Sequence, residues 1–265
     1  MTNTTVILPI NKIDTAITSY LEKAVKSIEN QKVQPEELLI VTTKEVEINK
    51  EILQNVKHRI IVNEGATDFC SQINFGVDNI DTEYFSILEV DDEYSKIWFD
   101  NVQKYIKSYG DEVDTFLPIV LDVNVEGRFL HFTNEPVWAK EFSDKLGFLD
   151  NDSLLNFPNF QLSGAVIRKE AFKAVGGLKP GIKLHFIYEF FLRMSYYDKK
   201  IMTIPKLGYK KTNMRPDSLF FSYYTEGPDK IDVIEARFWY NVARRECYFK
   251  NDRGIKFDRE TATIV

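Results

Sequence analysis

The 265-residue sequence lacks the features that mark several broad classes of protein. It has two cysteines, Cys70 and Cys247, and three scattered histidines, so neither a disulfide framework nor a structural zinc site is expected. No window approaches the roughly 18 consecutive apolar residues of a membrane span. The N-terminus has no basic region, and its apolar run at 6–10 is too short for a signal peptide. We therefore expect a soluble, reduced, cytoplasmic protein.

Three familiar motifs are also missing. The first apolar run continues as Pro9, Ile10 and Asn11 rather than as Gly-x-Gly-x-x-Gly, and the sequence has no Gly-x-x-x-x-Gly-Lys-Ser/Thr. It has no Gly-x-Ser-x-Gly either. These absences disfavour a dehydrogenase, a P-loop enzyme and an α/β-hydrolase.

Charge is distributed unevenly around a formal net charge of −6. Residues 206–265 hold 12 basic and 9 acidic groups, whereas residues 1–205 hold 22 and 31. The acidic body argues against general nucleic-acid coating. The cationic, aromatic tail fits either a surface for a phosphate-bearing partner or a closing helix with a solvated charged face.

The first 120 residues alternate apolar runs with segments of helical periodicity. Strands are predicted at 6–10, 38–41, 60–62 and 84–88, and helices at 17–28, 48–56, 69–80 and 97–105. Apolar strands separated by helices predict a parallel sheet covered on both faces. In such an open sheet, ligands bind at the carboxyl ends of the strands.

The second half is less regular. Strands are predicted at 114–124, 128–132, 162–167 and 201–204, and helices at 137–146, 169–175, 185–197 and 231–248. We predict loops for the rest of 133–160. No linker or internal repeat divides the chain, so one domain is expected.

An acidic cluster follows the predicted strand at 84–88: Glu89, Asp91, Asp92 and Glu93 lie within five residues. Carboxylates this close repel one another unless a cation offsets them. Mg²⁺ and Mn²⁺ take such oxygen ligands and bridge them to phosphates. The alternative is a solvated acidic turn before the next helix.

The surroundings of this cluster resemble family-2 glycosyltransferases. The similar segments, in order, are 6–11, Leu21 with Ser27 and Gln31, 37–41, Gly65 with Asn74 and Gly76, 83–92, 163–177 and 188–193. The resemblance implies an α/β GT-A fold, a Rossmann-like mixed open sheet flanked by helices. It implies a nucleotide-sugar-binding half at 1–122 and an acceptor half at 123–215, followed by a helical C-terminal extension at 216–265.

The resemblance also implies a nucleotide-sugar donor, expected to be UDP-linked, with Mn²⁺ or Mg²⁺ held by Asp91 and Asp92, and inversion at the anomeric carbon. Glu89 is expected to face the ribose or a metal-bound water. Lys211 and Arg215 either fold over the donor diphosphate or belong to a plain surface loop. The residues expected to contact the donor are Pro9, Ile10, Asn11, Thr42, Thr43, Gly65, Asp68, Asn74, Glu89, Val90, Asp91, Lys211 and Arg215.

Two positions depart from the family pattern. Thr42 and Thr43 follow the strand that usually ends in a base-reading Asp, and Ile187 stands where the family places its general base. His185, Glu189 and Arg193 are four residues apart and are expected to share one helix face. We predict Glu189 as the base and His185 as second choice. The alternatives are an ion pair between Glu189 and Arg193, and a metal- or diphosphate-binding role for His185.

The sequence thus predicts a metal-dependent, inverting glycosyltransferase, and the alternative is a non-catalytic nucleotide-sugar-binding module. For the acceptor, two candidates stand side by side: a hydroxymethylated base in bacteriophage DNA and a bacterial surface glycan. His131 and Trp138 fall where acceptor contacts are expected, although ordinary packing also accounts for them.

Overall fold

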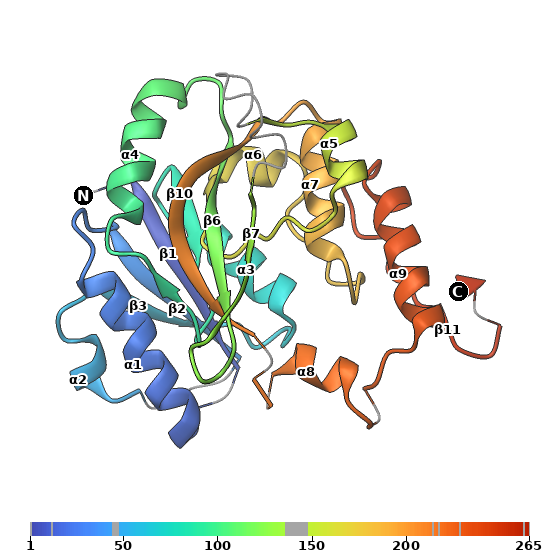
Figure 1. Ribbon diagram of the computed structural model, residues 1–265, viewed down its shortest axis with the longest axis horizontal. Coiled ribbons are helices and arrows are strands. Elements are labelled where there is room, and N and C mark those ends of the chain that lie inside the picture. The colour runs from blue at the N-terminus through green and yellow to red at the C-terminus, as the bar shows by residue number, and fades with distance from the viewer. Residues whose placement is uncertain are drawn as a thin grey trace.

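A central mixed sheet with helices on both faces organises the chain (Figure 1). The computed structural model describes residues 2–11, 13–43, 48–135, 148–213, 215–216, 218–227, 229–261 and 263–264. Within these residues the sheet order is β3-β2-β1-β4-β9-β6-β10-β5, with β7 beside β6 and β8 beside β10. This is the α/β architecture that the sequence predicts.

The N-terminal half of the sheet is parallel. It consists of β1 (Thr4–Ile10), β2 (Glu37–Thr42), β3 (His58–Val62) and β4 (Tyr84–Ile87). These strands are mostly apolar because β1, β2 and β4 are covered on both faces, and the few polar residues in them, such as Thr5 and Ser86, are buried. The predictions of four strands in this half are confirmed.

Two hydrophobic cores lie on opposite faces of the sheet. One face carries α1 (Thr15–Glu29), α2 (Lys50–Leu53) and α4 (Trp98–Tyr109). The other carries α3 (Phe69–Asp78), α6 (Lys169–Ala174) and α7 (Phe186–Tyr196) (Figure 1). Helix α1 begins where Asp14 accepts the backbone N–H of Ile17, which is an N-cap.

The second half continues the sheet with β5 (Glu93–Tyr94), β6 (Thr115–Val123), β7 (Phe129–Thr133), β8 (Phe148–Leu149), β9 (Val166–Arg168) and β10 (Ile201–Thr212). Strand β9 is antiparallel to β4 and β6, and β10 is parallel to β6. The carboxyl ends of β1, β4, β6 and β10 therefore meet at one edge of the sheet.

Three predictions for this half need correction. The strand predicted at 162–167 begins only at Val166, because 162–165 form a turn in which Gly164 has φ +72°. Helix α5 (Asn151–Asn156) replaces a predicted loop. The strand predicted at 201–204 extends to Thr212, so Lys211 lies in β10 and not in a surface loop. The helix predicted at 137–146 falls outside the described residues.

The C-terminal extension contains α8 (Leu219–Tyr224), α9 (Val233–Glu246) and the pair β11 (Phe257–Asp258) and β12 (Thr263–Ile264). Helix α9 packs against α7 and buries Trp239, Val242 and Ala243. This geometry favours the closing-helix interpretation of the tail. Within the part of the chain that the structure describes, no helix has both the length and the apolar character needed to cross a bilayer.

Candidate active site

The acidic cluster lies just beyond β4, at the edge where the carboxyl ends of β4, β6 and β10 meet. We call Glu89, Val90, Asp91 and Asp92 the acidic tip. The end of β10 lies beside it, because the backbone N–H of Thr212 donates to Asp92 Oδ1 at 2.8 Å. Binding at this edge is what the topology of an open α/β sheet favours.

Asp92 is the most buried carboxylate of the acidic tip, with 2% of the residue exposed. Its second oxygen, Oδ2, is buried and has no hydrogen-bond partner among the described residues. Burial raises the pKa of Asp92 well above its usual range, and the charges of Glu89 and Asp91 raise it further. A buried carboxylate oxygen without a partner is costly unless a cation or proton reaches it.

Asp91 is held by a residue far away in the sequence. Arg215 Nε donates to Asp91 Oδ2 at 2.7 Å, and each side chain is 11% exposed. Burial and the neighbouring Glu89 raise the pKa of Asp91 even though Arg215 opposes them. The Arg215 guanidinium also lies 5.6 Å from the ring centroid of Tyr20, a cation–π contact. The structure thus places Arg215 at the acidic tip.

Lys211 provides a second positive charge at the carboxylates. Its Nζ donates to Gln161 Oε1 at 2.7 Å. Burial lowers the pKa of Lys211, but Glu89, Asp92 and Asp122 outweigh this effect, and the net pKa is raised. Lys211 is therefore a cation at neutral pH.

Glu89 is fixed in place by two contacts. The hydroxyl of Ser163 donates to Glu89 Oε1 at 2.9 Å, and the backbone N–H of Glu89 donates to Tyr209 Oη at 3.0 Å. The neighbouring Val90 packs against the core on the α1 face of the sheet. Both residues therefore belong to a rigid tip.

Three of the predicted donor-binding residues lie at the carboxyl end of β1: Pro9 and Ile10 are its last two residues, and Asn11 follows it. Pro9 is half-buried, Ile10 is 2% exposed and packs in the core, and Asn11 is exposed. Asn11 Nδ2 donates to the carbonyl of Thr67 at 2.9 Å, which ties the β1 end to the loop before α3. Of the three, Asn11 presents a polar side chain at the edge of the sheet.

The expectations for Thr42 and Asn74 need correction. Thr42 is fully buried and its hydroxyl points to the Ile61 carbonyl at 3.4 Å, so the half-buried Thr43 is the one left to contact a base. The amide of Asn74 donates to the carbonyl of Leu178 at 2.8 Å and accepts its N–H at 2.9 Å. Asn74 therefore holds the backbone after α6 in place, and this structural role accounts for its amide group.

Gly65 and Asp68 lie in the exposed loop before α3. The N–H of Gly65 donates to Asn63 Oδ1 at 3.3 Å. Asp68 is the N-cap of α3, and its Oδ1 accepts the Ser71 N–H at 2.8 Å. Asp68 thus has a structural role as an N-cap. Contact with the nucleotide-sugar donor remains a prediction for both Gly65 and Asp68.

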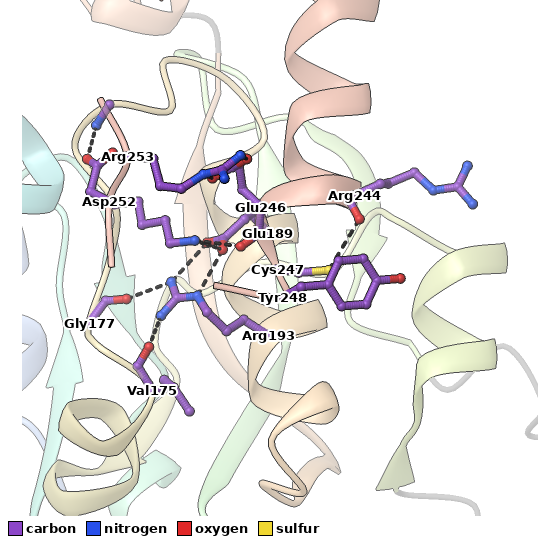
Figure 2. Close-up of polar contacts among 12 residues, drawn as sticks. Val175, Gly177, Glu189, Arg193, Arg244, Glu246, Cys247, Tyr248, Asp252 and Arg253 are labelled. Atoms are coloured by element: carbon purple, nitrogen blue, oxygen red, sulfur yellow. Dashed lines mark hydrogen bonds and ion pairs between the residues drawn. The ribbon is translucent and has the colours of Figure 1, made fainter. Parts of the chain in front are cut away.

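The position of Glu189 does not suit a general base. Glu189 is fully buried, and Figure 2 shows its carboxylate facing Arg193, whose Nε lies 2.8 Å away. Lys179 Nζ lies 2.9 Å from the same carboxylate. Both oxygens of Glu189 accept from Arg193. A base must reach the acceptor proton, and this carboxylate is enclosed by cations inside the protein. The ion-pair alternative holds, but the pair is buried rather than at the surface.

A cavity of about 670 Å³ opens beside the acidic tip. Its walls come from β7, the 156–161 segment, the start of α7 and α8, and Lys211 lies in its lining as well as beside the carboxylates. His185 and Ile187 also line it. Trp138, expected to contact the acceptor, lies outside the described residues. The shared Lys211 places the cavity next to the acidic tip.

His185 is the N-cap of α7, with a left-handed backbone at φ +62°. It does not belong to the helical face of Glu189 and Arg193, which corrects the sequence expectation for these three residues. Surrounding protein lowers the pKa of the imidazole by desolvation. The His185 ring meets the Tyr240 ring edge-on, with the two ring centroids 5.6 Å apart.

One carboxylate at this edge was missed by the sequence argument. Asp122, at the end of β6, is fully buried and accepts from Asn213 Nδ2 at 2.5 Å and Thr133 Oγ1 at 3.1 Å. The signal was available, since Asp122 falls at the carboxyl end of a predicted strand, as the acidic tip does. Gln161, which orients Lys211, falls between the predicted loops and the strand predicted at 162–167 and has no such signal.

The acidic tip fits a divalent cation. The observation that supports this is the buried Asp92 Oδ2 with no partner, beside the Asp91 carboxylate. No group of three or more His, Cys, Asp or Glu side chains is arranged around a metal position within the described ranges. The chain therefore offers two carboxylates, which matches the way Mg²⁺ takes one or two protein carboxylates and completes its shell with phosphate and water.

An open mixed sheet with an acidic tip at the carboxyl edge defines the chain as a protein of GT-A architecture. The sequence of residues 11–176 matches the model of Glycosyl transferase family 2. This match covers more than half of the chain, which therefore belongs to glycosyl transferase family 2. No curated protein matches the chain.

Two kinds of solved structure share the fold. TarS 1-349 of S. aureus in complex with UDP-GlcNAc aligns with a TM-score of 0.63 at 15% identity, over 92% of this chain and 66% of that one. The mannosyltransferase PcManGT from Pyrobaculum calidifontis, in complex with GDP-Man and Mn²⁺, aligns with a TM-score of 0.56 at 11% identity, over 83% and 59%. In a second structure of S. aureus TarS 1-349, at 17% sequence identity, this chain covers 61% of the length. The chain thus spans about two thirds or less of these proteins, and the likeness shows the fold.

Proposed function

We propose that the chain transfers a sugar from a UDP-linked donor to a hydroxyl of an acceptor in the cavity, with inversion at the anomeric carbon and with Mn²⁺ or Mg²⁺ as cofactor. The observation that carries this proposal is the partnerless buried oxygen of Asp92 beside two cations, Lys211 and Arg215. Support for a UDP-sugar and a metal comes from the neighbours, one bound to UDP-GlcNAc and another to GDP-Man and Mn²⁺.

The residues divide into a donor side and an acceptor side. On the donor side, Asp91 and Asp92 hold the metal, which as a Lewis acid offsets the charge that develops on the leaving diphosphate. Lys211 and Arg215 stabilise the same charge through fixed cations. Asn11 and Thr43, at the ends of β1 and β2, are the groups left to contact the nucleoside. This division requires no contribution from Glu189.

The acceptor side is aromatic. Phe132, Phe157 and Tyr224 line the cavity and are each more than 40% exposed. Exposed aromatic rings in a cavity suit stacking on a flat or apolar ring face. A glycan acceptor, including a bacterial surface glycan, fits this wall directly.

A hydroxymethylated base in phage DNA is the second candidate acceptor. It is favoured by three exposed cations on α9, Arg237, Arg244 and Arg245, of which Arg244 also lies 5.8 Å from the ring centroid of Tyr240. Arg253 and Arg259 do not contribute, because they pair with Glu246 and Glu235. Aromatic walls also suit an extruded base.

Calorimetry and a hydrolysis assay test the donor side. Wild-type protein is titrated with UDP in the presence and absence of Mn²⁺, and UDP-sugar hydrolysis is followed in parallel. We expect Asp91→Asn and Asp92→Asn to lose the Mn²⁺-dependent part of UDP binding. Asp152→Asn, at an exposed aspartate of α5, is the matched control and should bind as wild type. Equal UDP affinity with and without Mn²⁺ would refute the metal role.

Transfer assays decide between the acceptors. If the acceptor is modified DNA, transfer to hydroxymethylcytosine DNA should fall steeply with added salt, and Arg244→Ala together with Arg245→Ala should weaken it. Transfer to a glycan, insensitive to those substitutions, would refute the DNA acceptor. Binding of a UDP-sugar with neither hydrolysis nor transfer would instead identify a non-catalytic module.

A further inference from the structure

A polar row crosses three adjacent strands at the carboxyl edge of the sheet. Asp122 on β6 pairs in register with His131 on antiparallel β7 and with Lys211 on parallel β10. Side chains of paired residues project from the same face of a sheet. The row therefore runs from the cavity, which His131 lines, to the carboxylates that surround Lys211.

The middle member of the row is built to act on its neighbours. Asp122 is fully buried, and its two oxygens accept from Asn213 and Thr133, which fixes the carboxylate. His131 Nε2 lies 3.8 Å from Asp122 Oδ2, while the His131 side chain is 57% exposed. A fixed, buried carboxylate beside an accessible imidazole sets the orientation of the ring.

Few side chains of the cavity can take a proton. Among the described lining residues these are His131, Glu135 and His185, because Lys211 is already a cation. No carboxylate lies within ion-pair distance of His185 in the described part of the chain, and desolvation opposes protonation of its ring. Glu135 is exposed to solvent. Of these residues, His131 alone combines access to the cavity with a buried carboxylate 3.8 Å from its ring.

We propose that His131 is the general base of the transfer reaction and that Asp122 is its positioning residue. This inference rests on the proposed transferase function. The acceptor oxygen forms a bond to the anomeric carbon, the bond from that carbon to the diphosphate oxygen breaks, and the nucleoside diphosphate leaves with the electron pair. The acceptor proton goes to the His131 imidazole, whose Nε2–H faces Asp122 while Nδ1 accepts. His131 Nε2 lies 3.8 Å from Asp122 Oδ2, and a catalytic hydrogen bond of this kind tightens when the reacting groups are bound.

The experiment uses water as the acceptor, so it needs no knowledge of the natural one. UDP-GlcNAc, UDP-glucose and GDP-mannose are each incubated with the full chain and Mn²⁺, and sugar release is measured from pH 5 to 9. Donor binding is measured separately by calorimetry. The variants are His131→Ala and Asp122→Asn, with His58→Ala, an exposed histidine of β3, as the matched control.

We expect His131→Ala to slow hydrolysis by about 100-fold or more while the donor Kd stays unchanged, because a general base contributes roughly 10²- to 10⁴-fold. Free imidazole should restore part of the rate. The acid limb of the wild-type pH profile should vanish in His131→Ala, a change that a merely structural role would not produce. The charged and titratable groups that face the ring are Asp122 from β6, Lys211 from β10, and His185 and Glu135 from the cavity wall.

Asp122→Asn should lower the hydrolysis rate by roughly ten-fold or more without changing KM, because the ring loses its orienting carboxylate. If this buried substitution prevents folding, His131→Ala and imidazole rescue still decide the matter. Hydrolysis by His131→Ala at the wild-type rate would overturn the proposal, as would loss of hydrolysis in His185→Ala instead. A wild-type chain that binds none of the three donors, or that binds a donor and neither hydrolyses nor transfers it, would refute the proposed function itself, whereas unchanged hydrolysis in His131→Ala would refute the base alone.

Discussion

Glu189 Oε1 lies 2.9 Å from Lys179 Nζ in the interior of the protein, and neither side chain is more than 1% exposed. Lys179 Nζ also donates to the Glu246 carbonyl at the end of α9, at 2.6 Å. Arg193 binds the same carboxylate and donates to the carbonyls of Val175 and Gly177 (Figure 2). One carboxylate thus joins α7, the turn after α6 and the C-terminal helix.

Glu189→Gln is expected to destabilise the protein by about 3–5 kcal/mol, because it leaves two buried cations without a counter-charge. Folded protein should retain wild-type donor binding, since the contacts of Glu189 with Lys179 and Arg193 in the described part of the chain do not involve the acidic tip. Urea denaturation measures the first effect and calorimetry with UDP the second.

Glu226→Gln is the control for this prediction. Glu226 pairs with Lys230 four residues away, but its side chain is 87% exposed, so the pair should contribute little to stability. If Glu189→Gln unfolded at the same urea concentration as Glu226→Gln, the buried network would not hold the C-terminal helix.

Arg215→Ala should change metal and nucleotide binding in opposite directions. Arg215 occupies one oxygen of Asp91, so its removal should strengthen Mn²⁺ binding in the absence of nucleotide. The same change removes a cation from the diphosphate site and should weaken UDP binding, by roughly ten-fold for the loss of a charge-assisted hydrogen bond. Calorimetry with each ligand alone gives both values.

Lys210→Ala separates this effect from a general loss of charge. Lys210 lies in β10 next to Lys211, but it pairs with Glu93 and its side chain is 40% exposed. It should leave both affinities unchanged. A parallel loss of Mn²⁺ and UDP binding in Arg215→Ala would contradict the competition between Arg215 and the metal.

The parallel half of the sheet was predictable because its signals are local. Apolar runs such as Val6–Ile10 alternate with helical periods, and strands covered on both faces are predominantly apolar. The acidic tip was predictable for a similar reason: four carboxylates after a strand need a cation. Each of these inferences needs only residues that are neighbours in the sequence.

The partners of the site were not predictable, because they depend on contacts between distant segments. Glu189 and Arg193 have the spacing of an exposed helix pair, and only the position of Lys179 and α9 shows that they are buried. From the sequence, a surface loop is one of the two predictions for Lys211, because Pro205 and Gly208 interrupt the apolar pattern of β10. The strand nevertheless continues, through irregular pairing with β6. The strand propensity of single residues does not show that contacts with a neighbouring strand can maintain a strand across a proline or glycine.

His185→Asn should make stability less sensitive to acid. Desolvation lowers the pKa of His185 below the usual 6.5, so the unfolded chain binds a proton at a pH where the folded protein does not. Wild-type stability from this residue is therefore present above about pH 6.5 and is lost as pH falls toward the folded pKa. Asn tolerates the left-handed backbone at this position, so the variant removes only the imidazole.

The measurement is the urea midpoint at pH 7.5 and at pH 5.5. The drop between the two should be smaller in His185→Asn than in wild type. A drop of equal size in both proteins would show that His185 is as solvated in the fold as in the unfolded chain.

Gly164→Ala tests whether the turn before β9 supports the acidic tip. Gly164 has φ +72°, and a Cβ there would overlap the ring of Tyr209, whose hydroxyl accepts the N–H of Glu89. Backbone strain of roughly 1 kcal/mol adds to an overpacking cost of about 1–3 kcal/mol. Because Tyr209 must shift, UDP affinity should fall together with the urea midpoint. Gly127→Ala is the matched control. Gly127 has φ +78°, and a Cβ added there would have no heavy atom within 4 Å, so this variant has the backbone strain without the overlap. If both variants lost the same free energy of unfolding and both kept wild-type UDP affinity, the packing of Tyr209 against Gly164 would not support the acidic tip.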